Sequence, residues 1–232
     1  MGNGHEWAER FAGLADSLYP ADAGAIAQRA VAAATELVPA CDDAALCLMD
    51  RHGRPVPAAA SGEATAAAHR TWHTAGDGPC FATIRTGAVH PIPDLRRNGR
   101  WPAASRHAAE RAPICGVLIL PVKAGPDVLG ALMVAERSGS AAGPATIALG
   151  GVLATHTAVA LAGAAGRARG AELTEALRSS RLIGMAVGIV MARRRLTPEQ
   201  AFDLLRRHSR RGNGKIRELA LEILHTGRLP DD

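Results

Sequence analysis

The sequence lacks the short motifs that mark most nucleotide-dependent and hydrolytic enzymes. It contains no P-loop, no dinucleotide-binding glycine fingerprint, no Gly-x-Ser-x-Gly elbow and no cluster of His and Asp with metal-ligand spacing. We therefore predict no catalytic residue, no bound metal and no resident cofactor.

Cysteine is also scarce, and its four positions form no recognisable pattern. Cys41, Cys47, Cys80 and Cys115 have neither metal-ligand spacing nor the spacing of a disulfide framework. The first ten residues, MGNGHEWAER, have no apolar run behind their charges, unlike a secretory signal. These two features predict four free thiols in a reducing cytoplasm.

Charge is missing from one long stretch, residues 138–166, which contain no Asp, Glu, Lys or Arg. The stretch is long enough to cross a bilayer, but it consists mostly of Ala and Gly and lacks the large aliphatic side chains that drive insertion. We predict a helix that packs against other elements or a second copy of itself, and no membrane span. His156 within it would ligate haem or line a pocket in one interpretation, and is a core or interface histidine in the favoured one.

The positive charge is concentrated at one end of the chain. Residues 167–228 hold 14 basic and 6 acidic residues, an excess of 14 − 6 = +8, whereas residues 1–166 hold 13 basic and 14 acidic residues. This asymmetry indicates that the C-terminal part meets a polyanion. The alternative is a charged helical face that contacts only solvent.

Three helices are predicted in the basic part, over residues 171–194, 198–210 and 214–226. The second begins at Thr197-Pro198-Glu199-Gln200, which combines a capping box with proline at the first helical position. Phe202, the only aromatic residue of this part, is expected in the core beside Ala201 and Leu205. Gly184 and Gly188 favour close packing of a partner helix over direct contact with a ligand.

The same stretch resembles the ANTAR domain in the order and spacing of its residues. The matching positions are Ala176-Leu177, Arg181, Ile183-Gly184, Ala186, Gly188 to Met191, Ala201-Phe202, Leu205-Arg206, Ser209, Asn213, Lys215 and Ala220. The resemblance implies an RNA-binding three-helix module that dimerises and acts in transcription antitermination. Met185 and Val187 stand where glutamine and lysine are common in the family, so one phosphate contact is expected to be missing.

The candidate RNA-binding residues are the basic side chains of this module and one turn residue. They are Arg181, Arg193, Arg194, Arg206, Arg210, Asn213, Lys215 and Arg217. Arginine pairs with phosphate and stacks on unpaired bases, which suits the loop of an RNA hairpin. Asn213, in a Gly-Asn-Gly turn, either caps the third helix, as we favour, or contacts a base.

The rest of the chain reads as helices around short strands. Helices are expected over residues 4–18, 21–38, 63–74, 80–86 and 144–165, and strands over 44–49, 56–61, 89–92, 115–122 and 128–134. Residues 94–102, including Trp101, are interpreted as a surface connection. This order predicts an α+β sandwich, not a βαβ array.

A second resemblance, to the GAF domain, covers residues 21–165. It rests on Asp77-Gly78-Pro79-Cys80, the segment from Asp94 to Trp101-Pro102, and Leu129-Gly130-Ala131-Leu132. It implies a sensory module with a pocket over one sheet face and an unknown small-molecule ligand. Cys80 is either a redox thiol or, as favoured, a small buried hydrophobe, and the pair His69 and His73 is a solvated helix face in preference to a metal site.

Together these features predict an α+β GAF-like sandwich with an antiparallel sheet, followed by an all-α three-helix module. The expected boundaries are an N-terminal helical segment (1–20), the sensor (21–166), a hinge (167–170) and the RNA-binding module (171–229). The predicted function is a cytoplasmic, homodimeric, signal-responsive antitermination regulator that binds structured RNA. The alternatives are a DNA-binding transcription factor and a haem or redox sensor.

Overall fold

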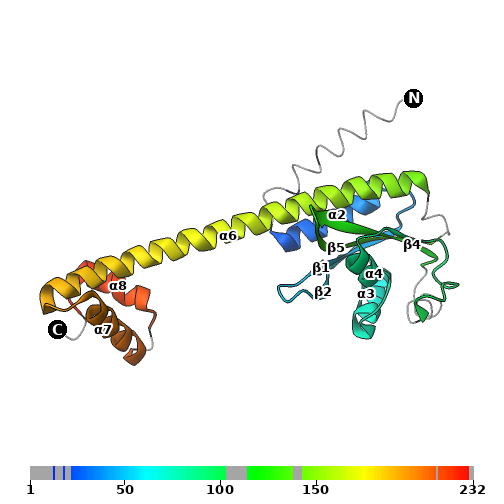
Figure 1. Ribbon diagram of the computed structural model, residues 1–232. Helices are drawn as coiled ribbons and strands as arrows, with labels where there is room; N and C mark the ends of the chain where they lie inside the picture. Colours follow the sequence, from blue (N-terminus) through cyan, green and yellow to red (C-terminus); the bar gives the residue numbers. More distant parts are fainter. Residues whose placement is uncertain are drawn as a thin grey trace. The chain divides into compact units, whose positions relative to one another are not determined.

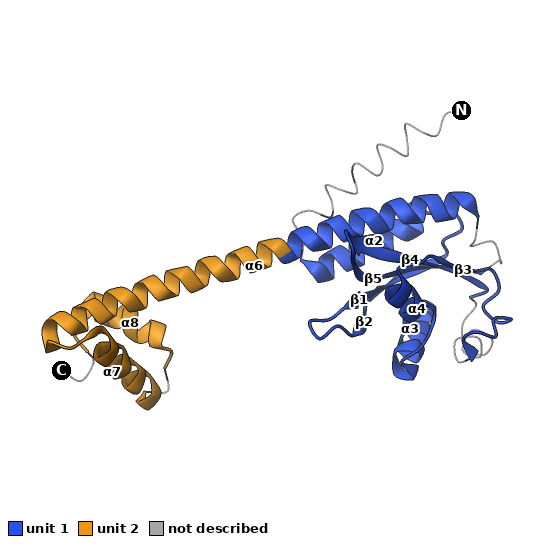
Figure 2. Cartoon of the chain, viewed as in Figure 1, with its two compact units in different colours: residues 1–165 blue, residues 166–232 orange. Residues whose placement is uncertain are grey.

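The computed structural model describes residues 22–102, 114–137, 143–212 and 214–229, together with positions 13 and 18. The chain forms two compact units, Met1–Ala165 and Gly166–Asp232, coloured blue and orange in Figure 2. The helix predicted over residues 4–18 lies outside the described residues except at positions 13 and 18, and Asn213 lies outside them as well.

The N-terminal unit contains a five-stranded sheet with helices on both faces (Figure 1). Its elements are α2 (Ala23–Leu37), β1 (Asp43–Met49), β2 (Pro55–Ala60), α3 (Glu63–Ala75), α4 (Pro79–Thr86), β3 (His90–Ile92), β4 (Gly116–Ala124), β5 (Asp127–Glu136) and the first part of α6 (Pro144–Arg194). The strand order is β2-β1-β5-β4-β3, and every neighbouring pair is antiparallel. The predicted α+β class and antiparallel sheet are confirmed.

Alternation along the central strands creates two hydrophobic cores, because successive side chains of a strand point to opposite faces. Leu118 and Leu120 of β4 pack with α2 and α6, whereas Val117 and Ile119 pack with α3 and α4. Figure 1 shows these two helix pairs on opposite sides of the sheet. Both faces are therefore covered within this unit.

Gly130 allows β5 to lie directly beside β1. A Cβ atom at this position would collide with the carbonyl oxygen of Cys47 and crowd the side chain of Leu48. Only glycine fits without moving one strand away from the other.

Two predictions about the N-terminal unit are wrong. Trp101 is only 5% exposed and belongs to the core under α3 and α4, because the segment after β3 folds back and brings Trp101 edge-on to His90, at 5.9 Å between ring centroids. His69 is 5% exposed, whereas His73 is exposed. One turn of α3 separates the two: His69 is enclosed beside Cys80 of α4, whereas His73 lies near the ring of Phe81 at the edge of this contact and stays exposed.

The C-terminal unit consists of the rest of α6, α7 (Pro198–Arg211) and α8 (Ile216–Thr226). Its core is small and comprises Ala186, Val190, Ala201, Leu205, Ala220, Ile223 and Leu229. The predicted capping box is confirmed. The backbone N–H of Gln200 donates to Thr197 Oγ1 (3.3 Å), and the backbone N–H of Thr197 donates to the side-chain Oε1 of Gln200 (3.0 Å). The third helix starts two residues later than expected, because Lys215 is its N-cap.

The residues predicted as a hinge, 167–170, are helical and continue α6. Arg167, Ala168 and Arg169 all favour helix, and a single Gly170 costs only about 1 kcal/mol relative to alanine. The break expected from their polarity is therefore absent from the secondary structure.

By length and composition α6 is the one described helix that meets the criteria for a membrane span, with a mean hydropathy of 1.6 over its most apolar window. Leu153, Ala154, Ala158 and Leu161 of this helix are buried against the sheet in the N-terminal unit. This part of α6 packs within the N-terminal unit and the helix continues into the C-terminal unit, so α6 is not a membrane span.

Candidate nucleic-acid interface and sensor pocket

Helix α7 has one apolar and one cationic face. Ala201 and Leu205, four residues apart, are fully buried in the core of the C-terminal unit. Phe202, Arg206 and Arg210, again at spacings of four, share a different face, and all three side chains are exposed. The sequence of α7 thus both anchors the helix and presents two guanidinium groups beside an aromatic ring.

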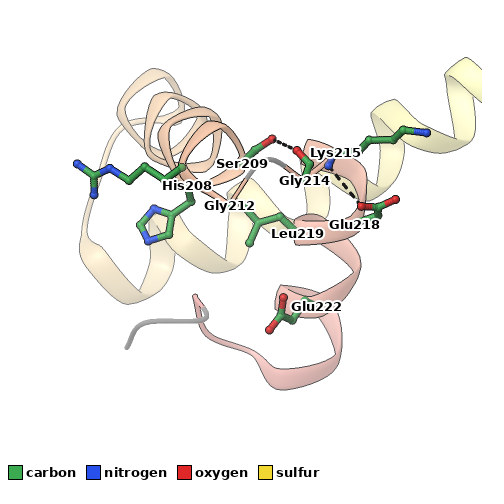
Figure 3. Close-up of a pocket in the computed structure, with 9 residues that line it drawn as sticks. His208, Ser209, Gly212, Gly214, Lys215, Glu218, Leu219 and Glu222 are labelled. Carbon is green, nitrogen blue, oxygen red and sulfur yellow. Dashed lines mark hydrogen bonds between the residues drawn. The ribbon is translucent and has the colours of Figure 1, made fainter.

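The turn from α7 to α8 is held by hydrogen bonds drawn in Figure 3. Ser209 Oγ donates to the carbonyl oxygen of Gly214 at 2.7 Å, and the Lys215 amide donates to Glu218 Oε2 at 3.3 Å. The Gly214 amide also donates to the Ser209 carbonyl oxygen at 3.1 Å. These bonds fix Lys215 at the start of α8, next to the end of α7.

Two depressions flank this turn, and Ser209, Gly214 and Lys215 line both of them. The first, of about 430 Å³, is also lined by the carboxylates of Glu218 and Glu222 (Figure 3). The second, of about 540 Å³, is lined by Phe202, Arg206, Ser209, Arg210, Gly214, Lys215 and Ile216. None of these described lining residues is acidic, so the second depression, called the cationic depression below, suits an anionic ligand better.

The structure brings three of the eight candidate RNA-binding residues together, namely Arg206, Arg210 and Lys215. Arg206 also lies 3.8 Å from Asp203, one turn earlier in α7, in an exposed contact. Exposed ion pairs of this kind are weak, so Arg206 remains available to a phosphate.

Two other candidates are engaged within the C-terminal unit. Arg217 of α8 forms an ion pair with Glu175 of α6. The guanidinium group of Arg193 lies beside the C-cap of α8, 3.4 Å from the position that a Cβ atom of Gly227 would take. A cation there is stabilised by the carbonyl end of the helix. These two arginines contribute to the packing of α6 and α8 as well as to surface charge.

Arg181 and Arg194 are exposed on α6 and line neither depression. Asn213 falls outside the described residues, so the choice between a cap and a base contact stays as predicted from sequence. Gly184 and Gly188 face open space: a Cβ atom at either would meet no atom within 4 Å. None of the described residues packs against these two glycines.

Phe202 is a candidate site residue that sequence reasoning missed. We expected it in the core, yet it is 40% exposed and lines the cationic depression. With about 100° of rotation per helical residue, it is turned roughly 100° from Ala201 and 60° from Leu205, off the buried face. Its spacing of four from Arg206 was the signal that placed it on the cationic face.

The N-terminal unit contains a small cavity between the sheet, α3 and α4. Cys47, His69, Trp72 and Cys80 contribute to its lining. Its volume is about 10 Å³, which is room for about one water molecule. The described side chains around this cavity leave much less room than the ligand pocket expected over this sheet face.

Burial governs the chemistry of this cavity. It lowers the pKa of His69 to about 4, with a smaller effect from His73, and raises the pKa of Cys80 well above its ordinary value. Cys80 Sγ lies 3.5 Å from His69 Nε2. Cys80 is 2% exposed, as the favoured interpretation expected, and a protonated, buried thiol is a poor nucleophile.

The remaining cysteines are free as well. Among the described residues, no three His, Cys, Asp or Glu side chains are grouped to hold a metal ion. His156 is half-buried on α6.

Solved structures similar to this chain share the GAF fold. The GAF domain of a phosphoenolpyruvate-protein phosphotransferase from Coxiella burnetii is 19% identical, with 73% of this chain and 99% of that chain covered and a TM-score of 0.56. A corresponding Acinetobacter domain is 13% identical over 72% of this chain and 97% of that chain, with a TM-score of 0.55. The free methionine-R-sulfoxide reductase of Neisseria meningitidis is 15% identical over 72% and 95%, with a TM-score of 0.54. At these identities the likeness concerns the fold alone.

Family comparison identifies both units. The sequence matches the GAF domain over residues 20–162, more than half of the chain, and the ANTAR domain over residues 171–224. No curated protein matches the sequence. The chain therefore belongs to the GAF domain family and carries an ANTAR domain after its GAF domain, the architecture of a signal-responsive transcription antitermination regulator.

Proposed function

We propose that this protein is a cytoplasmic, non-enzymatic regulator whose ANTAR domain binds an RNA hairpin through the cationic depression, under control of the GAF domain. One observation carries the proposal: Arg206, Arg210 and Lys215 line the same depression, and its described lining contains no acidic residue. Phosphate groups are the ligands that such a cluster favours. A small molecule bound by the GAF domain is the proposed signal.

RNA, not duplex DNA, is the proposed polyanion. The major groove of paired RNA is too narrow for side chains, so sequence-specific proteins read unpaired bases in loops. A duplex-DNA reader instead inserts a recognition helix into a groove. A gel-shift comparison of a hairpin RNA with a DNA duplex of equal length tests this choice, and tighter binding to the duplex would contradict the proposal.

Substitution of the cationic residues tests the location of the interface. Arg206→Ala and Lys215→Ala should each weaken binding to all RNA sequences alike and lower the salt slope by about 0.7 to 0.9. Arg54→Ala, which removes an equally charged and 71% exposed side chain from the GAF domain, is the matched control and should have no effect. Unchanged RNA affinity in both test variants would show that this face contacts only solvent.

A homodimer is the proposed state. Val152, Val159, Leu173 and Leu177 of α6 are between 42% and 67% exposed, which leaves large apolar side chains in water in a single chain. A second copy is the natural cover for a repeated apolar surface on one helix. A monomer in light scattering at micromolar concentration would contradict this state.

A further inference from the structure

Phe202 is an aromatic residue at the surface of the ANTAR domain. Its side chain is 40% exposed, and it is not among the seven buried residues that form the core of the C-terminal unit. Binding sites commonly combine hydrophobic or aromatic side chains with a few polar groups that converge on one place. Here Arg206, Arg210 and Lys215 line the same depression.

We propose that Phe202 is the platform on which one unpaired base of the bound RNA stacks, while Arg206, Arg210 and Lys215 hold the adjoining phosphates. This inference rests on the proposed RNA binding and adds the element that recognises a base. Every base has a flat face that stacks on an aromatic ring, and such contacts occur beside cationic side chains in proteins that bind single strands. The depression, of about 540 Å³, has the size of a small-molecule site.

The charge around Phe202 argues for a nucleotide over a protein partner. Near the three basic residues of the cationic depression, Asp203 lies 3.8 Å from Arg206, and the Glu218 carboxylate accepts a hydrogen bond from the Lys215 backbone amide but lines only the other depression. A second copy of this chain would bring like charges together at this face, which is unfavourable. A base with its phosphates satisfies the ring and the cations at once.

The test uses the full chain, a set of hairpin RNAs with one stem and different loops, and three variants. Phe202→Ala and Phe202→Leu should weaken hairpin binding by about tenfold or more, because stacking is lost. Phe202→Trp should bind at least as tightly as the original protein. The salt slope should not change in any of them, since no cation is removed, whereas Arg206→Ala lowers it.

A second arm identifies the base. Each loop nucleotide is replaced in turn by an abasic one, and affinity is measured for the original protein and for Phe202→Leu. At one loop position, the abasic replacement should weaken binding to the original protein by about tenfold. The same replacement should have little effect on binding to Phe202→Leu, because that variant has already lost the stacking contact. Leucine keeps an apolar side chain at an exposed site, so this variant preserves the fold even if the alanine variant does not.

The outcomes separate this inference from the proposed function. If all Phe202 variants bind alike and no abasic position couples to Phe202, the stacking role is wrong while RNA binding stands. If the original protein binds no hairpin, both fail. If the variants change the oligomeric mass and leave RNA affinity unchanged, Phe202 belongs to a protein interface and the inference is overturned.

Discussion

The two units of this protein differ in what they bury. The GAF domain covers both faces of its sheet and encloses His69, Cys47 and Cys80. The ANTAR domain has a core of only seven buried residues and leaves its arginines outside. One domain shields chemical groups from water, and the other has a small core with charged side chains at its surface; each prediction below tests one side of this comparison.

The largest expected effect is on the small core. Leu205 is fully buried, so Leu205→Ala should destabilise the ANTAR domain by about 2 to 5 kcal/mol. Thermal melting followed by circular dichroism measures the loss. The matched control is Leu221→Ala, because Leu221 is only half-buried and outside the core cluster, and it should melt much closer to the original protein. Equal melting of both variants would show that Leu205 does not anchor α7.

The next effect concerns the buried histidine of the GAF domain. Burial lowers the pKa of His69 from 6.5 to about 4, so between these pH values the unfolded chain binds a proton that the folded domain does not. Stability contributed by neutral His69 is therefore complete above pH 6.5 and declines as the pH falls, by up to about 3 kcal/mol.

Chemical denaturation at several pH values between 4 and 7 tests this dependence. His69→Gln should flatten the profile relative to the original protein, although its stability at neutral pH is lower. His73→Gln, at an exposed position one turn away, should keep the original slope. A slope that survives in His69→Gln would assign the pH dependence to another group.

A smaller effect is expected at the start of α7. Thr197 Oγ1 accepts a hydrogen bond from the Gln200 amide at 3.3 Å, and Thr197→Ala should cost about 1 kcal/mol because that donor loses its partner. Thr174→Ala makes the same substitution in α6, where the hydroxyl only donates to the Gly170 carbonyl oxygen, and should be close to neutral. Comparison of the two melting temperatures isolates the cap.

The smallest effect on stability is expected for the ion pair between Arg217 and Glu175. Both side chains are partly exposed, at 42% and 47%, so Glu175→Gln should cost less than about 1 kcal/mol. The same change removes one negative charge and releases Arg217, so RNA binding should strengthen and its salt slope should steepen. Weaker RNA binding in this variant would mean that the pair itself positions the interface.

The sequence was sufficient for the elements with strong local patterns. The strands over 115–122 and 128–134 were bounded by turn residues, and Thr197-Pro198-Glu199-Gln200 marked the start of α7 without ambiguity. Their boundaries shifted by one or two residues, as expected where helix and strand ends are set by neighbouring elements.

Residues whose environment depends on distant segments were harder to predict. Trp101 lies among charged residues in the sequence but is buried because its segment returns to the sheet. His69 and Cys80 are eleven positions apart and meet only because α3 and α4 pack together. For Phe202 the spacing from Arg206 was readable in the sequence, but the face of α7 that is buried follows from how α6 and α8 cover Ala201 and Leu205.

Replacement of a glycine by a larger residue has different consequences in the two domains. Any side chain at Gly130 would separate β1 from β5, so related proteins should retain glycine there whatever ligand they sense. Gly184 and Gly188 have open space around them, and this chain alone would tolerate alanine at both. If related proteins nevertheless keep these two glycines, a second molecule that packs against α6 is what selects for them. The positions of α6 that stay glycine would then mark the surface that this molecule contacts.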